Sequence, residues 1–219
     1  MDKKFLKKII AQSPEDLQII SACCAEAKVK ISEIKYLPSS KIFLISLLRL
    51  NKENENNKSS IKSIIECSNK NEVPVYVDPK FDNYSSYKGV RLFKPNLVEY
   101  KAITKEEEFG PLPKSGFRFK DRMNSEILLL TLGSSGMSLY FDGIHESIPT
   151  KARDVYDVSG AGDTVIATFA LNDLCGLKPL ESAIIANLAA GRVCEDIGVC
   201  PITIDSLIDF FSHHYSLDY

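Results

Sequence analysis

The stretch that decides the fold of this 219-residue chain is Asp157-Val158-Ser159-Gly160-Ala161-Gly162-Asp163-Thr164. The residues that follow it, up to Leu171, are mostly apolar and predict a helix that begins at the glycines. A Gly-rich turn that enters a helix leaves several backbone N–H groups unpaired at the positive end of the helix dipole. Such a turn favours the binding of an anion, above all phosphate.

Asp163 directly follows the glycines, in the first turn of the expected helix. A carboxylate repels a phosphate, so its presence there needs an explanation. One interpretation is that Asp163 takes a proton from a hydroxyl group that attacks the phosphate. The other is that the helix dipole stabilises an acid at this position and that the glycines only shape a turn. The Gly-x-Gly-Asp pattern alone favours neither interpretation.

The composition is that of an ordinary globular protein, with 44% hydrophobic residues, 26% charged residues and a net charge of −2. The length suits one domain with a sizeable core. The nearly neutral charge gives no general attraction to nucleic acid or anionic membrane, so phosphate binding requires a local site. The cysteines and histidines show no zinc-binding spacing. The apolar runs at the N-terminus are too short for a signal peptide or a membrane span, and we expect a cytoplasmic protein.

Strand and helix patterns alternate along the chain. We expect strands at 41–48, 73–77, 90–93 and 127–131, and a hairpin over 137–148 around an Asp-Gly turn. We expect helices at 13–28, from the Ser59-Ser60 cap onward, at 96–105, and in three segments from residue 164 to 211. Residues 51–58 are expected to form a polar loop, and 106–122 a loop or a short helix. This order predicts a mainly parallel α/β sheet that binds ligands beyond the carboxyl ends of its strands.

Three loops at such strand ends carry polar residues or glycines, and we expect them to converge. The first holds Asn96 and Glu99, the second Thr131, Gly133 and Gly136, and the third the Gly-rich stretch. Asn96 and Glu99 also fit a capping box, in which each side chain bonds the backbone N–H of the other residue. A ligand-binding and a purely structural interpretation of this pair both remain open.

The Gly-rich stretch resembles the second signature of the ribokinase-like (PfkB) carbohydrate kinases. Four other segments resemble, within that family, the D-glycero-D-manno-heptose 7-phosphate kinases. They are Pro74-Val75-Tyr76-Val77-Asp78-Pro79-Lys80, Tyr87-Lys88-Gly89, Lys94-Pro95-Asn96-Leu97-Val98-Glu99 and Val155-Tyr156-Asp157. The resemblance runs from about residue 59 to 211. It implies a three-layer α/β/α fold with a mainly parallel central sheet, and an enzyme that uses ATP and Mg²⁺.

The resemblance also implies roles for residues of the Gly-rich stretch. Asp163 would be the catalytic base that removes the proton from the sugar hydroxyl. The anion hole for the transferring phosphoryl group would be formed by the N–H groups of Gly160, Ala161 and Gly162.

Other residues match the nucleotide and metal sites of the family. Asn96 and Glu99 match an N-x-x-E element near the triphosphate, with Glu99 acting on magnesium through water. The loop under the nucleotide is matched by Thr131, Gly133 and Gly136. Asn187 matches the asparagine beside the adenine, and the structural alternative for Asn187 is an exposed helix residue.

The first part of the chain departs from the family pattern. Family members are considerably longer and begin with a Gly-Asp substrate motif, a Gly-Gly-Ala-Asn segment and a small β lid. Where a family strand ends in Ser-Asp-Tyr-x-Lys-Gly, this chain has Ser46-Leu47-Leu48-Arg49-Leu50-Asn51. We therefore expect an N-terminally truncated member with a degenerate part at 1–58 and a nucleotide-binding and catalytic core at 59–219. The N-terminal strands and the β lid would be missing or degenerate.

The implied function is ATP-dependent phosphorylation of a sugar hydroxyl. The implied reaction converts heptose 7-phosphate to heptose 1,7-bisphosphate, for ADP-heptose and the lipopolysaccharide core. The alternatives are a catalytically impaired nucleotide-binding remnant or subunit, and a kinase for another sugar. The expected small-molecule partner is a sugar phosphate, and a homodimer is an assembly that the resemblance allows. We expect no nucleic acid and no membrane as partner.

Overall fold

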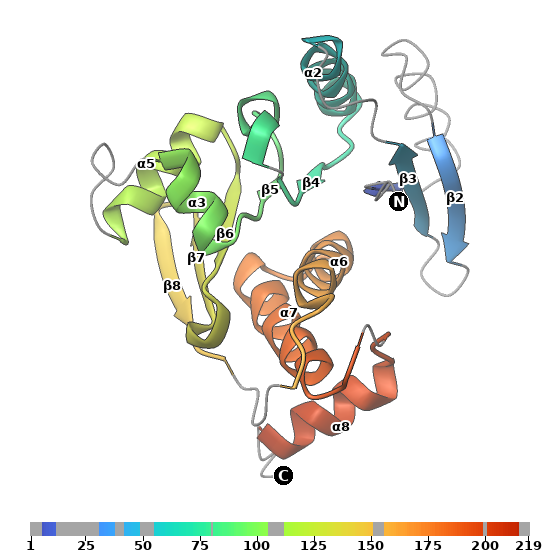
Figure 1. The fold of residues 1–219 in the computed structure, drawn as a ribbon, viewed down its shortest axis with the longest axis vertical. Coiled ribbons are helices and arrows are strands. Elements are labelled where there is room, and N and C mark those ends of the chain that lie inside the picture. Colours follow the sequence, from blue (N-terminus) through green and yellow to red (C-terminus); the bar gives the residue numbers. More distant parts are fainter. Residues whose placement is uncertain are drawn as a thin grey trace.

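The computed structural model describes residues 6–11, 31–37, 42–48, 55–79, 81–104, 112–150, 156–198 and 201–214. These residues form two separate sheets, one of three strands and one of five (Figure 1). Within the described part of the chain, no helix has both the length and the apolar character needed to cross a membrane.

The five-stranded sheet has the strand order β4-β5-β6-β7-β8. Its strands are β4 (Tyr76–Val77), β5 (Leu92–Phe93), β6 (Ile127–Thr131), β7 (Met137–Phe141) and β8 (Ile144–Ile148). The β4–β5 and β5–β6 pairs are parallel, and the β6–β7 and β7–β8 pairs are antiparallel. The predicted α/β sheet is therefore present, and the antiparallel pairs come from the hairpin that follows β6.

The predicted hairpin is confirmed. Asp142 and Gly143 connect β7 to β8 with positive φ angles of 44° and 75°. Positive φ at both central residues is what a two-residue hairpin turn requires, and Asp-Gly adopts it readily. The parallel strands expected at 73–77 and 90–93 lie at the predicted places, but only two residues of each form ladder pairs.

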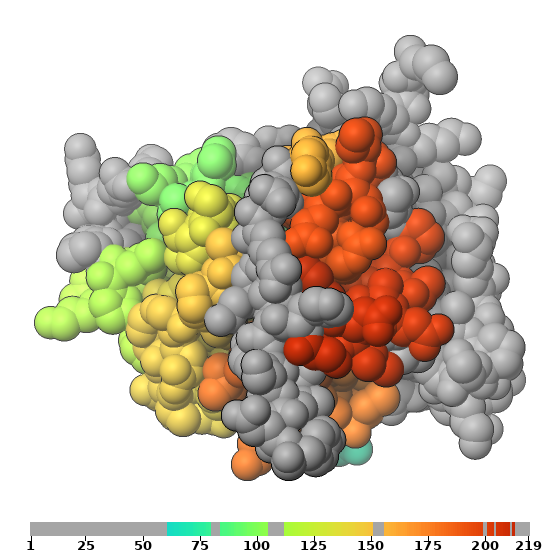
Figure 2. All heavy atoms as spheres, turned by 90° about the horizontal axis from the view of Figure 1, so that it is seen from below, coloured from blue at the N-terminus to red at the C-terminus, as the bar shows by residue number. Residues whose placement is uncertain are grey.

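Helices cover both faces of the five-stranded sheet (Figure 1). One layer contains α2 (Glu55–Lys70), α3 (Leu97–Thr104) and α5 (Lys114–Met123). The other contains α6 (Ala161–Leu174) and α7 (Pro179–Cys194), and α8 (Ile204–His214) packs against α7. Figure 2 shows α8, in red, on the same face of the molecule as part of the hairpin region, in yellow. The expected three-layer α/β/α arrangement is thus observed.

Strand β6 divides its side chains between two hydrophobic cores. Leu128 and Leu130 pack in the core beneath α3 and α5, whereas Ile127 and Leu129 pack in the core beneath α6 and α7. All four side chains are at most 1% exposed. Successive residues of a strand point to opposite faces, so a strand covered on both sides is apolar throughout. This explains the continuous apolar run at 127–130.

Helix α2 begins earlier than predicted. It starts at Glu55, so residues 55–58 are helical rather than part of a loop, and Ser59-Ser60 is not its cap. The buried side chains of Ile64 and Ile65 anchor this helix. Each residue added to an existing helix gains a hydrogen bond, so the helix extends through polar residues at little cost. Residues 51–54 lie outside the described residues.

The three-stranded sheet contains the strand predicted at 41–48. This strand, β3 (Ile42–Leu48), lies between β1 (Leu6–Ala11) and β2 (Ile31–Leu37), and both pairs are antiparallel. Strands β1 and β2 were not predicted, and the helix expected at 13–28 falls outside the described residues. Helix α5 occupies part of the segment for which we expected a loop or a short helix.

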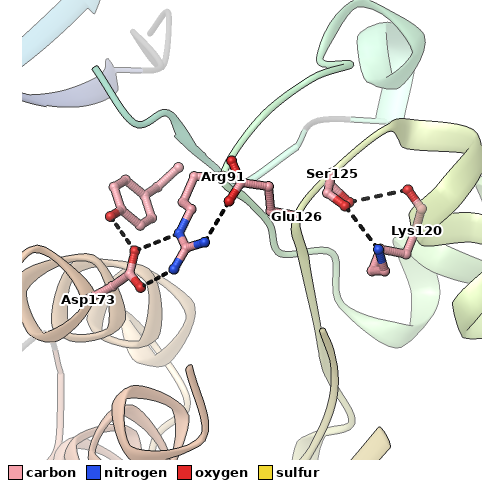
Figure 3. A network of polar contacts seen from close by, with 6 residues as sticks. Arg91, Lys120, Ser125, Glu126 and Asp173 are labelled. Carbon is pink, nitrogen blue, oxygen red and sulfur yellow. Dashed lines mark hydrogen bonds and ion pairs between the residues drawn. The ribbon is translucent and has the colours of Figure 1, made fainter. Parts of the chain in front are cut away.

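A network of charged residues joins α6 to the parallel strands (Figure 3). Arg91, just before β5, donates to Asp173 of α6 from Nη2 (2.7 Å) and Nε (3.0 Å) and to Glu126 from Nη1 (2.6 Å). The hydroxyl of Tyr76 in β4 donates to Asp173 Oδ2 at 2.6 Å. Burial and the bond to Asp173 raise the pKa of Tyr76, so the hydroxyl remains a donor. Bidentate pairing of this kind fixes orientation as well as distance.

Replacing Asp173 by Asn should destabilise the fold, because it removes the charge that Arg91 pairs with at a site where the aspartate is only 5% exposed. We expect the free energy of unfolding to fall by about 2 kcal/mol, measured by urea denaturation. The matched control is Glu66→Gln, which removes a charge from the exposed Lys62–Glu66 pair on α2. That pair should contribute less than about 0.5 kcal/mol. Equal losses in the two variants would contradict a structural role of the network.

Candidate active site

The Gly-rich stretch forms the N-terminus of α6. Gly160 is the N-cap residue and has a left-handed backbone conformation, with φ of 83° and ψ of −8°. This conformation strains any residue with a β-carbon, which explains the glycine. The first helical bond runs from the Thr164 N–H to the Gly160 carbonyl at 2.9 Å, and the Ala161 N–H donates to the Val158 carbonyl at 3.2 Å. The N–H groups of Gly162 and Asp163 come before the first helical bond of α6 and have no intrahelical acceptor.

Asp163 lies in the first turn of α6 and is exposed. No side chain caps this helix end. The turn therefore presents backbone donors and an exposed carboxylate together, which is the arrangement that the sequence predicted. A phosphate bound by these donors would lie next to a carboxylate that can accept a proton.

Asp157, the first residue of the stretch, has a structural role that the sequence analysis did not assign. Its Oδ1 accepts from the Ser159 N–H at 2.8 Å, and its Oδ2 accepts from the Gly198 N–H at 3.1 Å. Hydrogen bonds from Ser159 and from the Gly198 N–H lower the pKa of Asp157. A lowered folded pKa means that this carboxylate stabilises the fold at neutral pH and that the contribution is lost as the pH falls through that value. An Asp-x-Ser turn is the local signal that could have predicted it.

The carboxyl ends of the parallel strands meet beside this helix end. Asp78 follows β4 and Lys94 follows β5, and Lys94 Nζ lies 3.0 Å from Asp78 Oδ1. A β-carbon built at Gly162 would lie 3.6 Å from Lys94 Nζ, so the ammonium group approaches the first turn of α6. The pairing of Lys94 with Asp78 was not predicted. Their opposite charges, directly after two neighbouring strands, are the sequence signal for it.

The loop that begins at Thr131 lies at the same edge of the sheet. Asn96 forms an isolated parallel bridge with Thr131, and the Thr131 N–H donates to the Pro95 carbonyl at 3.1 Å. The strand ends that carry Asn96 and Thr131 are therefore neighbours, as predicted. The convergence of all three loops follows from the order β4-β5-β6 and the approach of α6 to Lys94.

Asn96 and Glu99 form the capping box of α3. The Glu99 N–H donates to Asn96 Oδ1 at 2.8 Å, and the Asn96 N–H donates to Glu99 Oε2 at 2.9 Å. The structural interpretation of this pair is thus correct, and it leaves Glu99 Oε1 for another partner. Among the described residues, no group of three or more His, Cys, Asp or Glu side chains could enclose a metal ion. One partly engaged carboxylate still suits magnesium, which keeps several waters and binds phosphate oxygens.

Gly136 and Asn187 both contact the backbone at the end of β8. A β-carbon built at Gly136 would lie 2.0 Å from the Ile148 carbonyl oxygen, and its φ is 87°. Asn187 in α7 is 5% exposed, and its Nδ2 donates to the Pro149 carbonyl at 2.8 Å. The alternative of an exposed helix residue is therefore wrong for Asn187. Gly133 also has a positive φ, of 61°, but apart from its chain neighbours no atom of the described residues lies within 4 Å of a β-carbon built there.

A family model described as pfkB family carbohydrate kinase matches residues 10–205. The chain belongs to the pfkB family of carbohydrate kinases. The match includes the Gly-rich stretch, the strand-end loops and Asn187.

Curated relatives of this pfkB-family chain include proteins named bifunctional protein HldE. The protein from Syntrophotalea carbinolica is 34% identical over 165 residues, which cover 73% of this chain and 33% of the relative. The protein from Nitratiruptor sp. is 39% identical over 142 residues, which cover 63% of this chain and 30% of the relative. The chain thus spans about a third of the length of these relatives.

Solved structures show the same fold. Ribokinase from Thermotoga maritima superposes with a TM-score of 0.58 at 20% identity, over 69% of this chain and 53% of that enzyme. Phosphofructokinase-2 from Escherichia coli, in complex with potassium, superposes with a TM-score of 0.65 at 15% identity, over 71% of this chain and 52% of that enzyme. The ribokinase-like fold predicted for the pfkB-family chain is confirmed.

Replacing Gly136 by Ala should disrupt the loop between β6 and β7, because the new methyl group meets the backbone of residues 148–150. We expect the free energy of unfolding to fall by roughly 2–4 kcal/mol, measured by urea denaturation. The control is Gly143→Ala in the hairpin turn, where φ is 75° but no atom lies within 4 Å. Backbone strain alone should cost about 1 kcal/mol there. Similar losses of unfolding free energy in both variants would show that the backbone near Gly136 shifts at little cost to make room for the methyl group.

Proposed function

We propose that this chain transfers a phosphoryl group from ATP to a sugar hydroxyl. The observation that carries the proposal is the N-terminus of α6, where N–H groups without intrahelical acceptors lie next to the exposed Asp163. Donors at the positive end of a helix stabilise the charge of a phosphoryl group in transfer. The membership of the pfkB family of carbohydrate kinases supports the same reaction.

In this proposal Asp163 is the base and the first turn of α6 is the anion hole. The sugar hydroxyl oxygen attacks the γ-phosphorus in line, its proton passes to Asp163, and the bond to the ADP oxygen breaks. The N–H groups of Gly160 and Gly162 donate to the oxygens of the phosphoryl group, whereas the Ala161 N–H between them donates to the Val158 carbonyl at 3.2 Å. Helix α6 is held on the sheet by Asp173, so these donors need no rearrangement during transfer.

The nucleotide is assigned to the side of the sheet that carries β7 and β8. Support comes from the contacts of Gly136 and Asn187 with residues 148–150, and from the pairing of Thr131 with Asn96 near the proposed phosphate site. Apart from its chain neighbours, no atom of the described residues lies within 4 Å of a β-carbon built at Gly133, which supports a ligand over the same loop. In this proposal Asn187 holds the wall of the nucleotide site through Pro149.

Magnesium is assigned to Glu99. When bound, the ion would neutralise charge on the phosphates. Glu99 Oε1 is free of the capping box and is the oxygen that would accept from a water of the ion. The Asn96 N–H holds the carboxylate in place through its other oxygen, Oε2.

The sugar we propose is heptose 7-phosphate, which would give heptose 1,7-bisphosphate for ADP-heptose and lipopolysaccharide synthesis. Support comes from the resemblance of residues 73–99 to the heptose 7-phosphate kinases and from the similarity to the HldE proteins. A cytoplasmic location, a homodimer and the division into parts 1–58 and 59–219 belong to the same proposal.

Replacing Asp163 by Asn should abolish transfer while nucleotide binding survives, since the amide cannot accept the proton. We expect the rate with ATP and heptose 7-phosphate to fall by roughly 10²–10⁴-fold. The affinity for AMP-PNP, measured by calorimetry, should stay within about twofold of the wild-type value because the backbone donors remain. The control is Asp142→Asn, the same change in the exposed hairpin turn.

Two other outcomes have clear meanings for this proposal. Loss of AMP-PNP binding in Asp163→Asn would contradict the role of Asp163 as a base. A wild-type chain that binds AMP-PNP but phosphorylates none of a panel of sugars and sugar phosphates would favour the nucleotide-binding remnant.

Replacing Glu99 by Gln should separate the metal role from the capping role. Glutamine can serve in a capping box, so Tm should change little, whereas the Mg²⁺ concentration for half-maximal rate should rise by roughly 10-fold or more. The control is Glu181→Gln, because Glu181 accepts from the Lys178 N–H at 2.8 Å in the capping box of α7. If the two variants need the same Mg²⁺ concentration, Glu99 only caps α3.

A further inference from the structure

Lys94 is buried more deeply than lysines usually are. It is 2% exposed, and its ion pair with Asp78 is 3.0 Å long. Lysine side chains are almost never fully buried unless they are paired. An ammonium group has three N–H donors, and the bond to Asp78 uses one of them. Within the described residues Lys94 pairs with Asp78 and not with Asp163.

The positive charges at and near Lys94 favour the binding of an additional anion. Its ammonium group approaches the first turn of α6 at Gly162, where the helix dipole is positive. Two positive groups in contact repel each other, and the repulsion is strong where water is excluded. Asp78 offsets one of them, whereas the carboxylate of Asp163 is exposed and forms no ion pair with Lys94. An anion that binds to both Lys94 and the turn would balance both positive groups.

The fold holds this lysine at the edge where α/β sheets bind ligands. Asp78 and Lys94 follow the neighbouring parallel strands β4 and β5, and the Lys94 N–H donates to the Val77 carbonyl at 2.8 Å. The carboxyl ends of parallel strands form the usual binding edge of such sheets. A β-carbon at Gly162 would be in van der Waals contact with Lys94 Nζ, so the glycine allows the ammonium group to lie close to the first turn of α6.

We propose that Lys94 binds the terminal phosphoryl group of the nucleotide together with the first turn of α6, and that Asp78 positions the lysine. This proposal rests on the proposed kinase function and adds a side-chain cation to its anion hole. Lys94 keeps its proton throughout and donates hydrogen bonds to the phosphoryl oxygens. No covalent bond to the lysine forms or breaks.

The test compares two nucleotides on the full chain with magnesium present, by calorimetry. AMP-PNP carries the terminal phosphoryl group and ADP lacks it. Lys94→Met should weaken AMP-PNP binding by roughly 10- to 100-fold, as expected for loss of hydrogen bonds from a charged group. ADP binding should change by less than about threefold, because the lysine is assigned to the group that ADP lacks. The control Lys114→Met removes an exposed lysine at the start of α5 and should change neither affinity.

A second variant covers the case in which Lys94→Met does not fold because Asp78 is left without its partner. Asp78→Asn combined with Lys94→Met removes both charges and should show the same selective loss of AMP-PNP binding. Equal changes for AMP-PNP and ADP, or no change, in a folded variant overturn the proposal. A wild-type chain that binds neither nucleotide overturns the proposed function itself, and the role of Lys94 with it.

Discussion

The docking of α6 on the sheet is the constraint on which the candidate site depends. Arg91 and Asp173 join the C-terminal part of this helix to the start of β5, and the core beneath the helix contains Val165 and Phe169. A 14-residue helix is about 20 Å long and moves as a rigid body. Because one end is fixed by charge and the middle by packing, the Gly-rich turn at the other end is held beside Lys94. The phosphate chemistry proposed here requires that position.

Signals that act over a few residues allowed correct predictions of structure. The Asp-Gly turn predicted the hairpin, the apolar run predicted β6, and the Asn96–Glu99 spacing predicted a capping box. The Gly-rich stretch likewise predicted the start of α6. In each case the residues that decide the geometry are neighbours in the sequence, so local preferences and the final structure agree.

Features that depend on distant partners were not predictable in this way. Strand β1 pairs with β3, which begins about 30 residues further along the chain, so the pairing partner of β1 is not visible in its local sequence. The burial of Asn187 depends on the carbonyl of Pro149, 38 residues away. The pair of Lys94 and Asp78 exists because two short parallel strands lie in register. The strands themselves were predicted to end at 77 and 93, as observed, but the sequence did not show that they are neighbours in the sheet.

The close approach at Gly136 has a mechanical consequence. Gly136, at the end of the loop at 132–136, lies directly against the backbone of residues 148–150, and Asn187 of α7 bonds the same segment. Loop, hairpin and α7 therefore move together. A movement of this loop away from the sheet would have to break the close contact at Gly136 and displace the segment that Asn187 bonds.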